Sequence, residues 1–220
     1  MTRLPMNWQS YDTVLLDMDG TVLDLAFDNW FWREAVPRYV ARSRATSIAS
    51  VREEIYAKFL EKQGTLDWYC LDYWTDVLGF DLKALKTASS HRIRFLPGAR
   101  EFLETLRQRS HRSVLVTNAH WHTLAVKRTV SGLDRYVERC VSAHEFAAPK
   151  EAADFWPRLR ERLDFDPQRT LLIDDSLPVL DAAAAFGIRG LVAVTRPYTR
   201  QPVRLVPRHL AVERVETLLP

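Results

Sequence analysis

The stretch VLLDMDGTVLDL, residues 14–25, places two carboxylates, Asp17 and Asp19, directly after an apolar run. An apolar run without polar alternation predicts a short strand that is buried on both faces. Side chains at positions i and i+2 of an extended segment point to the same side, so both carboxylates are expected to face one ligand. Gly20 follows them and permits a sharp turn with a close backbone approach.

Further apolar runs of strand length recur along the chain, and most of them end in polar residues. They cover residues 113–116, 170–173 and 191–194, with a weaker run at residues 139–142. Helical patterns lie between the runs, at residues 98–110 and at residues 177–188, where Gly187 is a suitable helix C-cap. Strands that alternate with helices predict an α/β fold with a parallel sheet, whose ligands bind at the carboxyl ends of the strands.

The segment from about residue 27 to residue 95 lacks such strand patterns. It is rich in aromatic residues and is expected to form several helices, with breaks near residues 43–50, at Gly64 and at Gly79. The sequence therefore predicts a core domain of residues 1–25 and 96–220, interrupted by a helical domain of residues 26–95.

Composition excludes several classes of protein. The net charge of +3 among 220 residues is too small to indicate nucleic-acid binding. No run of about 18 apolar residues predicts a membrane span, and the N-terminal stretch does not resemble a signal peptide. Cys70 and Cys140 occur in no CxxC or metal-ligand spacing, which favours a reducing cytoplasmic location.

The two carboxylates after the first strand match the requirements of phosphoryl transfer. Such a reaction needs an ionised carboxylate as nucleophile, for which Asp17 is the candidate. It also needs an acid that protonates the leaving oxygen and later activates water, for which Asp19 is the candidate. Neighbouring carboxylates raise each other's pKa, and a cation near Asp17 would leave that group ionised while Asp19 stays protonated.

The remaining requirements are met by polar residues after the other strands. Thr117 and Asn118 offer hydrogen-bond donors for the phosphoryl oxygens, and Lys150 offers a positive charge. Asp174 and Asp175 offer oxygen ligands for a hard cation. Each motif alone has a structural explanation, as a turn, a helix N-cap or a solvated lysine. Their joint occurrence, in order and after strands, favours the catalytic interpretation.

Four short motifs resemble those of the haloacid dehalogenase superfamily. They are DMDGT at residues 17–21, VTN at residues 116–118, Lys150 in APKEA, and IDDS at residues 173–176. The resemblance implies a Rossmann-like core, dependence on Mg²⁺ and an aspartyl-phosphate intermediate. The helical segment lies where subfamily I members carry a helical cap.

The same resemblance implies a role for each matching residue. Asp17 would be the nucleophile and a metal ligand, while Asp19 would be the acid/base and give its backbone carbonyl to the metal. Thr117 and Lys150 would bind the phosphoryl group. Asp175 would be a direct metal ligand, and the adjacent Asp174 a ligand or a partner of one.

Longer stretches are similar to bacterial GMP/IMP 5′-nucleotidases of this superfamily. They are VLLDMDGTVLDLAFDNWFW, LDWYCLDYW, TNAHWHTLAVK and IDDSLPVLDAAAAFGIR, and they lie in both the core and the cap. The similarity implies that a small phosphate monoester, a purine nucleotide, is the substrate. The alternatives are a phosphatase or phosphomutase of the superfamily acting on a small sugar phosphate or phosphoglycolate, and a non-enzymatic phospho-acceptor domain.

Substrate choice is expected to depend on residues near the start of the cap. Asp24, Asp28 and Asn29 could contact a base, and Trp30 either stacks on it or packs inside the cap. His120 and His122 are expected to cap or solvate a helix, with contact to phosphate or base as the alternative. A metal site at these histidines is not favoured, since the sequence suggests no third ligand.

Overall fold

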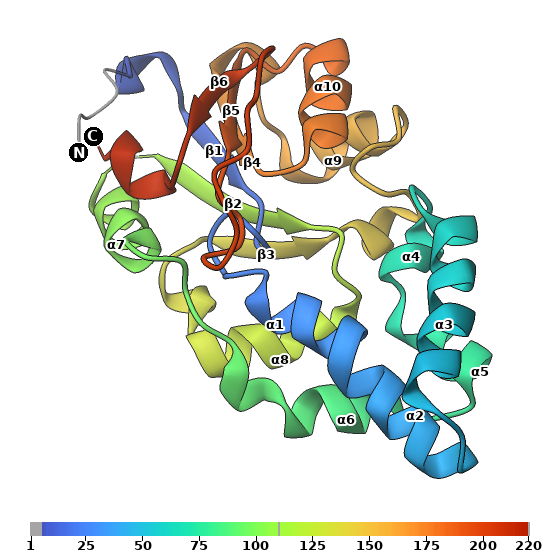
Figure 1. Ribbon diagram of the computed structural model, residues 1–220. Coiled ribbons are helices and arrows are strands. Elements are labelled where there is room, and N and C mark those ends of the chain that lie inside the picture. Colours follow the sequence, from blue (N-terminus) through green and yellow to red (C-terminus); the bar gives the residue numbers. More distant parts are fainter. Residues whose placement is uncertain (1–5, 110, 220) are drawn as a thin grey trace.

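The computed structural model describes residues 6–109 and 111–219, whose centre is a six-stranded parallel sheet (Figure 1). Its strand order is β3-β2-β1-β4-β5-β6. The strands are β1 Thr13–Leu16, β2 Arg112–Thr117, β3 Arg139–Ser142, β4 Thr170–Asp174, β5 Gly190–Val194 and β6 Leu210–Val212. The predicted parallel α/β fold is confirmed.

Helices cover both faces of the sheet. Buried side chains of α7 (Ala99–Gln108) and α8 (Trp121–Ser131) pack against one face, and those of α9 (Phe155–Leu163) and α10 (Leu177–Phe186) pack against the other. Alternate residues of β1 contribute to the two hydrophobic cores, so this central strand is buried on both sides. Gly187 ends α10 at a positive φ of 103°, as the sequence predicts.

The remaining α-helices lie between β1 and α7, in the segment of residues 26–95 that is named the helical insertion below. They are α1 Ala26–Trp30, α2 Val36–Arg44, α3 Ile48–Lys62, α4 Leu66–Tyr69, α5 Leu71–Leu78 and α6 Leu82–Ala88. A π-helical turn, Phe31–Ala35, joins α1 to α2. The insertion has its own hydrophobic cluster around Phe31 and Trp74. The predicted breaks agree with the ends of α2, α3 and α5.

The two ends of the helical insertion lie side by side. Leu23 and Phe95 form an antiparallel bridge, and Asp24 N donates a hydrogen bond to Arg94 O at 2.9 Å. This pairing anchors the insertion next to the end of β1, beside the sheet (Figure 1). None of the helices in the described part of the chain is long and apolar enough to cross a membrane.

Candidate active site

Parallel strand pairing brings the predicted site residues to one edge of the sheet. Asp17 N donates to Ile173 O at 2.9 Å and so extends the pairing of β1 with β4. Thr117 ends β2 and Asp174 ends β4, the two strands that flank β1. The structure therefore brings these side chains together at the carboxyl ends of the parallel strands, where ligands bind in such sheets.

The chain turns sharply at Gly20. This residue has a φ of +95°, and its N–H donates to Leu23 O at 2.7 Å. A Cβ atom at Gly20 would lie 2.7 Å from Pro197 Cβ and 2.8 Å from Asp175 Cγ. Both the backbone conformation and the lack of space require glycine, so the turn places Asp19 and Asp175 relative to each other.

Gly20→Ala is expected to lower the free energy of unfolding by about 1–3 kcal/mol more than Gly64→Ala. Gly64 is a matched control because its φ is +79° and a Cβ atom added there would meet no atom within 4 Å, so alanine introduces backbone strain without a clash. Urea unfolding of both variants measures the difference. Equal losses of unfolding free energy in the two variants would show that the close packing around Gly20 does not disfavour a Cβ atom.

Lys150 lies at the centre of the site and is 2% exposed. Its Nζ atom donates to Asp17 Oδ1 at 2.6 Å, to Asp174 Oδ2 at 2.7 Å and to Val116 O at 3.0 Å. Burial opposes the charged form, but the two carboxylates outweigh it and raise the pKa of Lys150. All three donors are engaged within the protein, so Lys150 holds Asp17 and Asp174 in this structure.

Asn118 organises the loop that carries Lys150. Its Oδ1 atom accepts a hydrogen bond from Lys150 N at 2.9 Å, and its Nδ2 atom donates to Glu151 Oε2 at 2.8 Å. Tyr69 of the helical insertion donates to Glu151 Oε1 at 2.6 Å. The side chain of Asn118 therefore contacts protein groups here. Tyr69 and Glu151 lie in the stretches LDWYCLDYW and APKEA, but neither was predicted as a site residue.

Three carboxylates gather beside Lys150. One oxygen from each of Asp17, Asp174 and Asp175 lies within 4.8 Å of the others. Asp17 Oδ2 is buried and has no hydrogen-bond partner among the described residues. Burial raises the pKa of Asp17 to about 6, although the positive charge of Lys150 lowers it. Burial and the negative charges of Asp17 and Asp174 raise the pKa of Asp175 well above 3.8. Such crowded oxygen ligands fit a hard cation such as Mg²⁺.

The two adjacent carboxylates of this group differ in their contacts. Asp174 is fully buried and accepts hydrogen bonds from Lys150 Nζ and, at 2.8 Å, from Ser176 N. Asp175 is held by a longer contact of 3.4 Å from Arg204 Nη2 to its Oδ2 atom. Asp175 is therefore the freer of the two to bind a cation.

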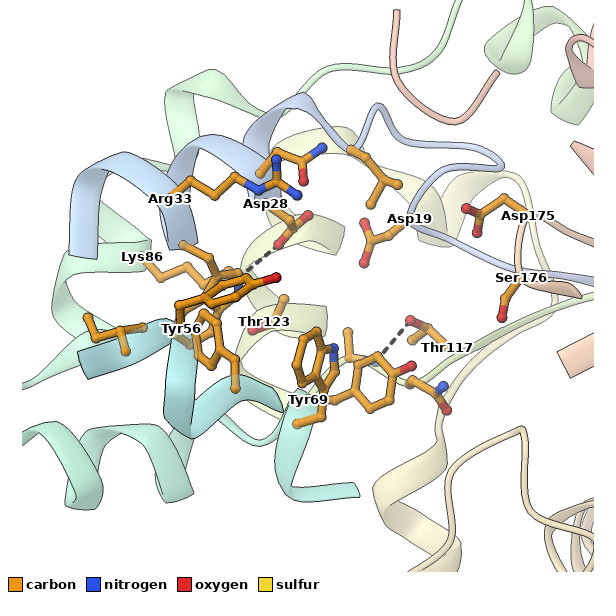
Figure 2. A pocket seen from close by; sticks show the side chains of 18 of the residues that line it. Asp19, Asp28, Arg33, Tyr56, Tyr69, Lys86, Thr117, Thr123, Asp175 and Ser176 are labelled. Carbon is orange, nitrogen blue, oxygen red and sulfur yellow. Dashed lines mark hydrogen bonds and ion pairs between the residues drawn. The ribbon is translucent and has the colours of Figure 1, made fainter. Parts of the chain in front are cut away.

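The carboxylate of Asp19 belongs to a separate charge chain of four buried or half-buried side chains. Lys127 Nζ lies 2.6 Å from Asp19 Oδ1 and 2.5 Å from Asp28 Oδ2, and Lys86 Nζ lies 2.9 Å from Asp28 Oδ1. Lys127 and Lys86 are 1% and 2% exposed. Figure 2 shows how Asp19, Asp28 and Lys86 follow one another from the sheet into the helical insertion.

The charge chain sets the electrostatics of Asp19 and Asp28. Burial raises the pKa of Asp19 to about 6 against the pull of Lys127, which is also the value for Asp17. Lys127 and Lys86 outweigh burial at Asp28 and hold its pKa below the ordinary value. In the protein without a cation, burial therefore raises the pKa of the carboxyl groups of both Asp17 and Asp19. The predicted separation, with Asp17 ionised and Asp19 protonated, would depend on a cation bound beside Asp17.

A cavity of about 980 Å³ extends from these carboxylates into the helical insertion. Asp17, Asp19, Thr117 and other predicted site residues line one end. Figure 2 shows Tyr69 beside Thr117 and places Arg33 and Tyr56 farther from Asp175. The insertion also contributes aromatic and charged side chains to the lining, namely Trp32, Phe59, Trp68, Arg52, Glu34 and Glu53. A phosphate at the carboxylates would thus have its organic group among aromatic rings.

The residues proposed for substrate choice occupy different places. Asp28 and Asn29 line the cavity. Trp30 packs between the core of the sheet domain and that of the insertion, with the Arg92 guanidinium 4.1 Å from its ring centroid. Asp24 accepts hydrogen bonds from Ala26 N at 2.8 Å and from the Thr199 hydroxyl at 2.6 Å. Trp30 and Asp24 therefore have structural contacts, and other aromatic residues face the cavity.

Of the two histidines predicted to cap or solvate a helix, His120 forms a cap and His122 contacts the helical insertion. His120 is the N-cap of α8, and its Nδ1 atom accepts a hydrogen bond from His122 N at 3.4 Å. His122 Nε2 lies 3.0 Å from the Thr87 hydroxyl of the helical insertion. Both side chains therefore lie where α8 meets the insertion.

Comparisons with known proteins agree with this geometry. A sequence model of haloacid dehalogenase-like hydrolases matches residues 11–187. Over 213 residues the chain is 41% identical to the protein named GMP/IMP nucleotidase YrfG of Escherichia coli (strain K12). The identity to the protein of the same name from Shigella flexneri is also 41%. Each match covers 97% of this chain and 96% of the relative. The crystal structure of a HAD phosphatase from Thermococcus onnurineus shares the fold, with a TM-score of 0.80 at 20% identity over 94% of this chain and 95% of that chain.

Proposed function

The chain belongs to the haloacid dehalogenase-like hydrolase family, and from this premise we propose that it is a phosphoric monoester hydrolase that cleaves purine nucleoside 5′-monophosphates, GMP and IMP. The observation that carries the proposal is the placement of Asp17 and Asp19 at the floor of an aromatic-walled cavity. The full-length similarity to two proteins named GMP/IMP nucleotidases supports the choice of substrate.

A Mg²⁺ ion is the proposed cofactor. Asp17 and Asp175 would bind it through their carboxylates, with Asp174 as a further ligand or as the partner that fixes Lys150. The backbone carbonyl of Asp19 would complete the protein's share of the ligands. The unpartnered Asp17 Oδ2 supports this assignment because a buried carboxylate oxygen without a donor is costly. When bound, the ion would offset the negative charge of the phosphate.

The proposed reaction has two steps on the same pair of aspartates. In the first, a carboxylate oxygen of Asp17 attacks phosphorus, the bond to O5′ breaks, and Asp19 gives its proton to the departing nucleoside oxygen. In the second, water attacks the phosphorus of the aspartyl-phosphate, the bond from phosphorus to the Asp17 oxygen breaks, and the water loses a proton to Asp19. Inorganic phosphate leaves, and both carboxyl groups return to their starting states. Thr117 would hold the phosphoryl oxygens, with Lys150 supplying positive charge.

The helical insertion is proposed to act as a cap that selects the leaving group. Its wall presents Trp32, Tyr56, Phe59 and Trp68 to the cavity. Stacking of a base on such rings contributes about 1–3 kcal/mol in nucleic-acid complexes. The cavity of about 980 Å³ is at the upper end of the usual range for small-molecule sites, which favours a nucleotide over a small sugar phosphate.

Cys70 and Cys140 are both free thiols, which supports the proposed cytoplasmic location.

A substrate panel tests the proposal. Phosphate release from GMP, IMP, ribose 5-phosphate and phosphoglycolate is measured with Mg²⁺ and with EDTA, and kcat/KM for GMP and IMP should exceed that for the others at least about tenfold. Equal turnover of the small phosphates would remove the nucleotide assignment. Activity undiminished by EDTA would contradict the proposed requirement for Mg²⁺. An isomerised sugar phosphate as product would indicate a phosphomutase. A stable phosphoprotein without turnover would indicate a phospho-acceptor domain.

Mg²⁺ is expected to raise the thermal midpoint more at about pH 8 than at about pH 5. Because burial raises the pKa of Asp17 to about 6 and that of Asp175 well above 3.8, the cation-free folded state retains protons that the unfolded chain releases. Its free energy of unfolding therefore falls as the pH rises through about 6. A bound cation counters this loss, by about 2.7 kcal/mol at a hundredfold excess over Kd.

Thermal unfolding with Mg²⁺ and with EDTA at both pH values measures this gain. Titrating groups elsewhere cancel in the difference at each pH. Protons compete with the cation at the lower pH, so an equal gain at both values would contradict binding to Asp17 and Asp175.

A further inference from the structure

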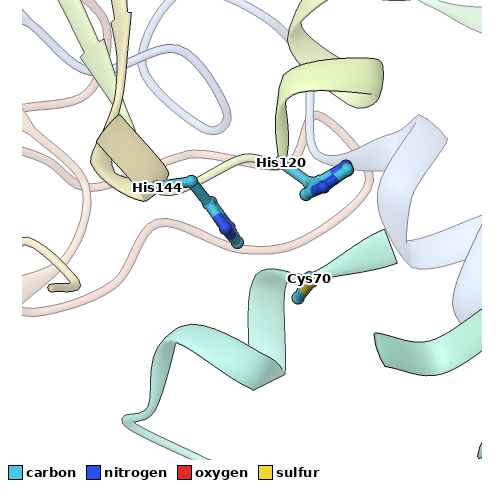
Figure 3. A group of neighbouring side chains, drawn as sticks. All are labelled: Cys70, His120 and His144. Atoms are coloured by element: carbon cyan, nitrogen blue, oxygen red, sulfur yellow. The ribbon is translucent and has the colours of Figure 1, made fainter. Parts of the chain in front are cut away.

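A thiol and two imidazoles from three separate segments meet where the helical insertion contacts the sheet domain (Figure 3). Cys70 lies between α4 and α5 of the insertion, His120 caps α8, and His144 follows β3. One ligand atom from each lies within 4.8 Å of the others. Figure 3 shows both histidines projecting from the sheet domain towards the part of the insertion that carries Cys70.

Local capping accounts for two of these residues but leaves the third unexplained. Cys70 Sγ accepts a hydrogen bond from Tyr73 N at 3.4 Å, and His120 caps its own helix. His144 Nε2 is buried and has no hydrogen-bond partner among the described residues. A buried ring nitrogen without a partner carries a free-energy cost, and here it belongs to a group of potential ligands.

Both imidazoles are suited to bind a metal at neutral pH. Burial, assisted by His120, lowers the pKa of His144 to about 4, and burial lowers the pKa of His120 despite the nearby Asp72. Neutral imidazole is the form that ligates metals. Asp72 Oδ2 lies 3.3 Å from His120 Nε2 and would hold the ring proton on that atom, so His120 Nδ1 would exchange its capping hydrogen bond of 3.4 Å for the metal.

We propose that Cys70, His120 and His144 form a binding site for a transition-metal ion of the Zn²⁺ type that ties the helical insertion to the sheet domain. One thiolate and two imidazoles suit Zn²⁺ or Co²⁺, whereas the oxygen ligands of the aspartate group suit Mg²⁺. Binding would release the thiol proton of Cys70. The fourth position is left to water.

The site would couple metal binding to the mobility of the helical insertion. Cys70 belongs to the insertion and both histidines to the sheet domain, so a bound ion would cross-link the two walls of the cavity. Backbone amides of residues 66–78 are therefore expected to exchange hydrogen more slowly with Zn²⁺ present. Neither this effect nor the binding itself depends on the proposed substrate.

Co²⁺ titration of the full chain tests the site, with saturating Mg²⁺ present to occupy the aspartate group. A thiolate ligand gives Co²⁺ a near-ultraviolet charge-transfer absorption, which should reach a plateau at one equivalent and be displaced by Zn²⁺. Cys70→Ser should abolish this absorption while retaining a good N-cap for α5. Cys140→Ser is the matched control, since it removes the other half-buried free thiol and should leave the absorption unchanged.

His144→Gln provides a second and independent variant. It should weaken Co²⁺ and Zn²⁺ binding at least about tenfold while Cys70 is intact. Circular dichroism and hydrogen exchange without metal establish that each variant is folded. The proposal is overturned if the native chain shows no thiolate absorption, if Cys70→Ser retains it, or if His144→Gln binds both ions as tightly as the native chain.

Discussion

Asp17→Asn is expected to abolish phosphate release, with kcat reduced at least about 10⁴-fold. The amide has nearly the same shape as the carboxylate but is a poor nucleophile towards phosphorus. It would also lose the ionic contact of 2.6 Å to Lys150 and one charge of the proposed metal site. Single-turnover and steady-state phosphate assays with GMP and IMP measure the effect.

Asp24→Asn is the matched control for this variant. Asp24 is also a buried carboxylate near the end of β1, with 7% exposure against 6% for Asp17, but it accepts hydrogen bonds from Ala26 N and the Thr199 hydroxyl. We expect Asp24→Asn to retain turnover within about tenfold of the native chain. The nucleophile assignment fails if Asp17→Asn, shown to be folded by circular dichroism, turns over GMP at a rate comparable to the control.

Asp19→Asn is expected to lower kcat about 10²- to 10⁴-fold while KM changes little. The amide can neither give a proton to the nucleoside oxygen nor accept one from water. Lys127 would keep its contact of 2.5 Å with Asp28, so the variant leaves one carboxylate partner for this buried cation. Steady-state assays with GMP and IMP determine kcat and KM separately.

The choice of leaving group separates the two tasks of Asp19. p-Nitrophenolate departs without being protonated, so the first step of Asp19→Asn should stay fast with p-nitrophenyl phosphate, while hydrolysis of the aspartyl-phosphate is slowed. The expected result is a burst of about one p-nitrophenolate per chain followed by slow release. A variant with native kcat for GMP, or with equal losses for both substrates and no burst, would refute the acid/base role.

The core of the site is predictable from sequence because its residues follow buried strands. Apolar runs identify five of the strands, and parallel pairing then requires Asp17, Thr117 and Asp174 to meet at one edge. Gly20 could likewise be interpreted locally, since a turn between two carboxylates and an apolar run needs glycine. These inferences need only strand direction and the alternation of side chains.

Other features depend on packing that no local pattern encodes. β6, Leu210–Val212, is too short for a clear pattern and is formed by pairing with β5. Lys86 and Lys127 look like ordinary helical surface lysines, and their burial follows from the way the insertion docks on α8. The aromatic residues that line the cavity could not be separated in advance from those that fill the insertion's core.

The charge chain restricts which insertions from related proteins could replace the helical insertion of this protein. Asp28 and Lys86 would travel with the transplanted segment, whereas Asp19 and Lys127 would stay behind. A new segment without a carboxylate at the position of Asp28 would leave Lys127 buried with Asp19 alone, and losing a partner of a buried ion pair costs about 3–5 kcal/mol. The same loss would change the acidity of the proposed proton donor. A grafted insertion would therefore need a carboxylate that pairs with Lys127. The residues that select the substrate and those that set the acidity of Asp19 would then have to change together.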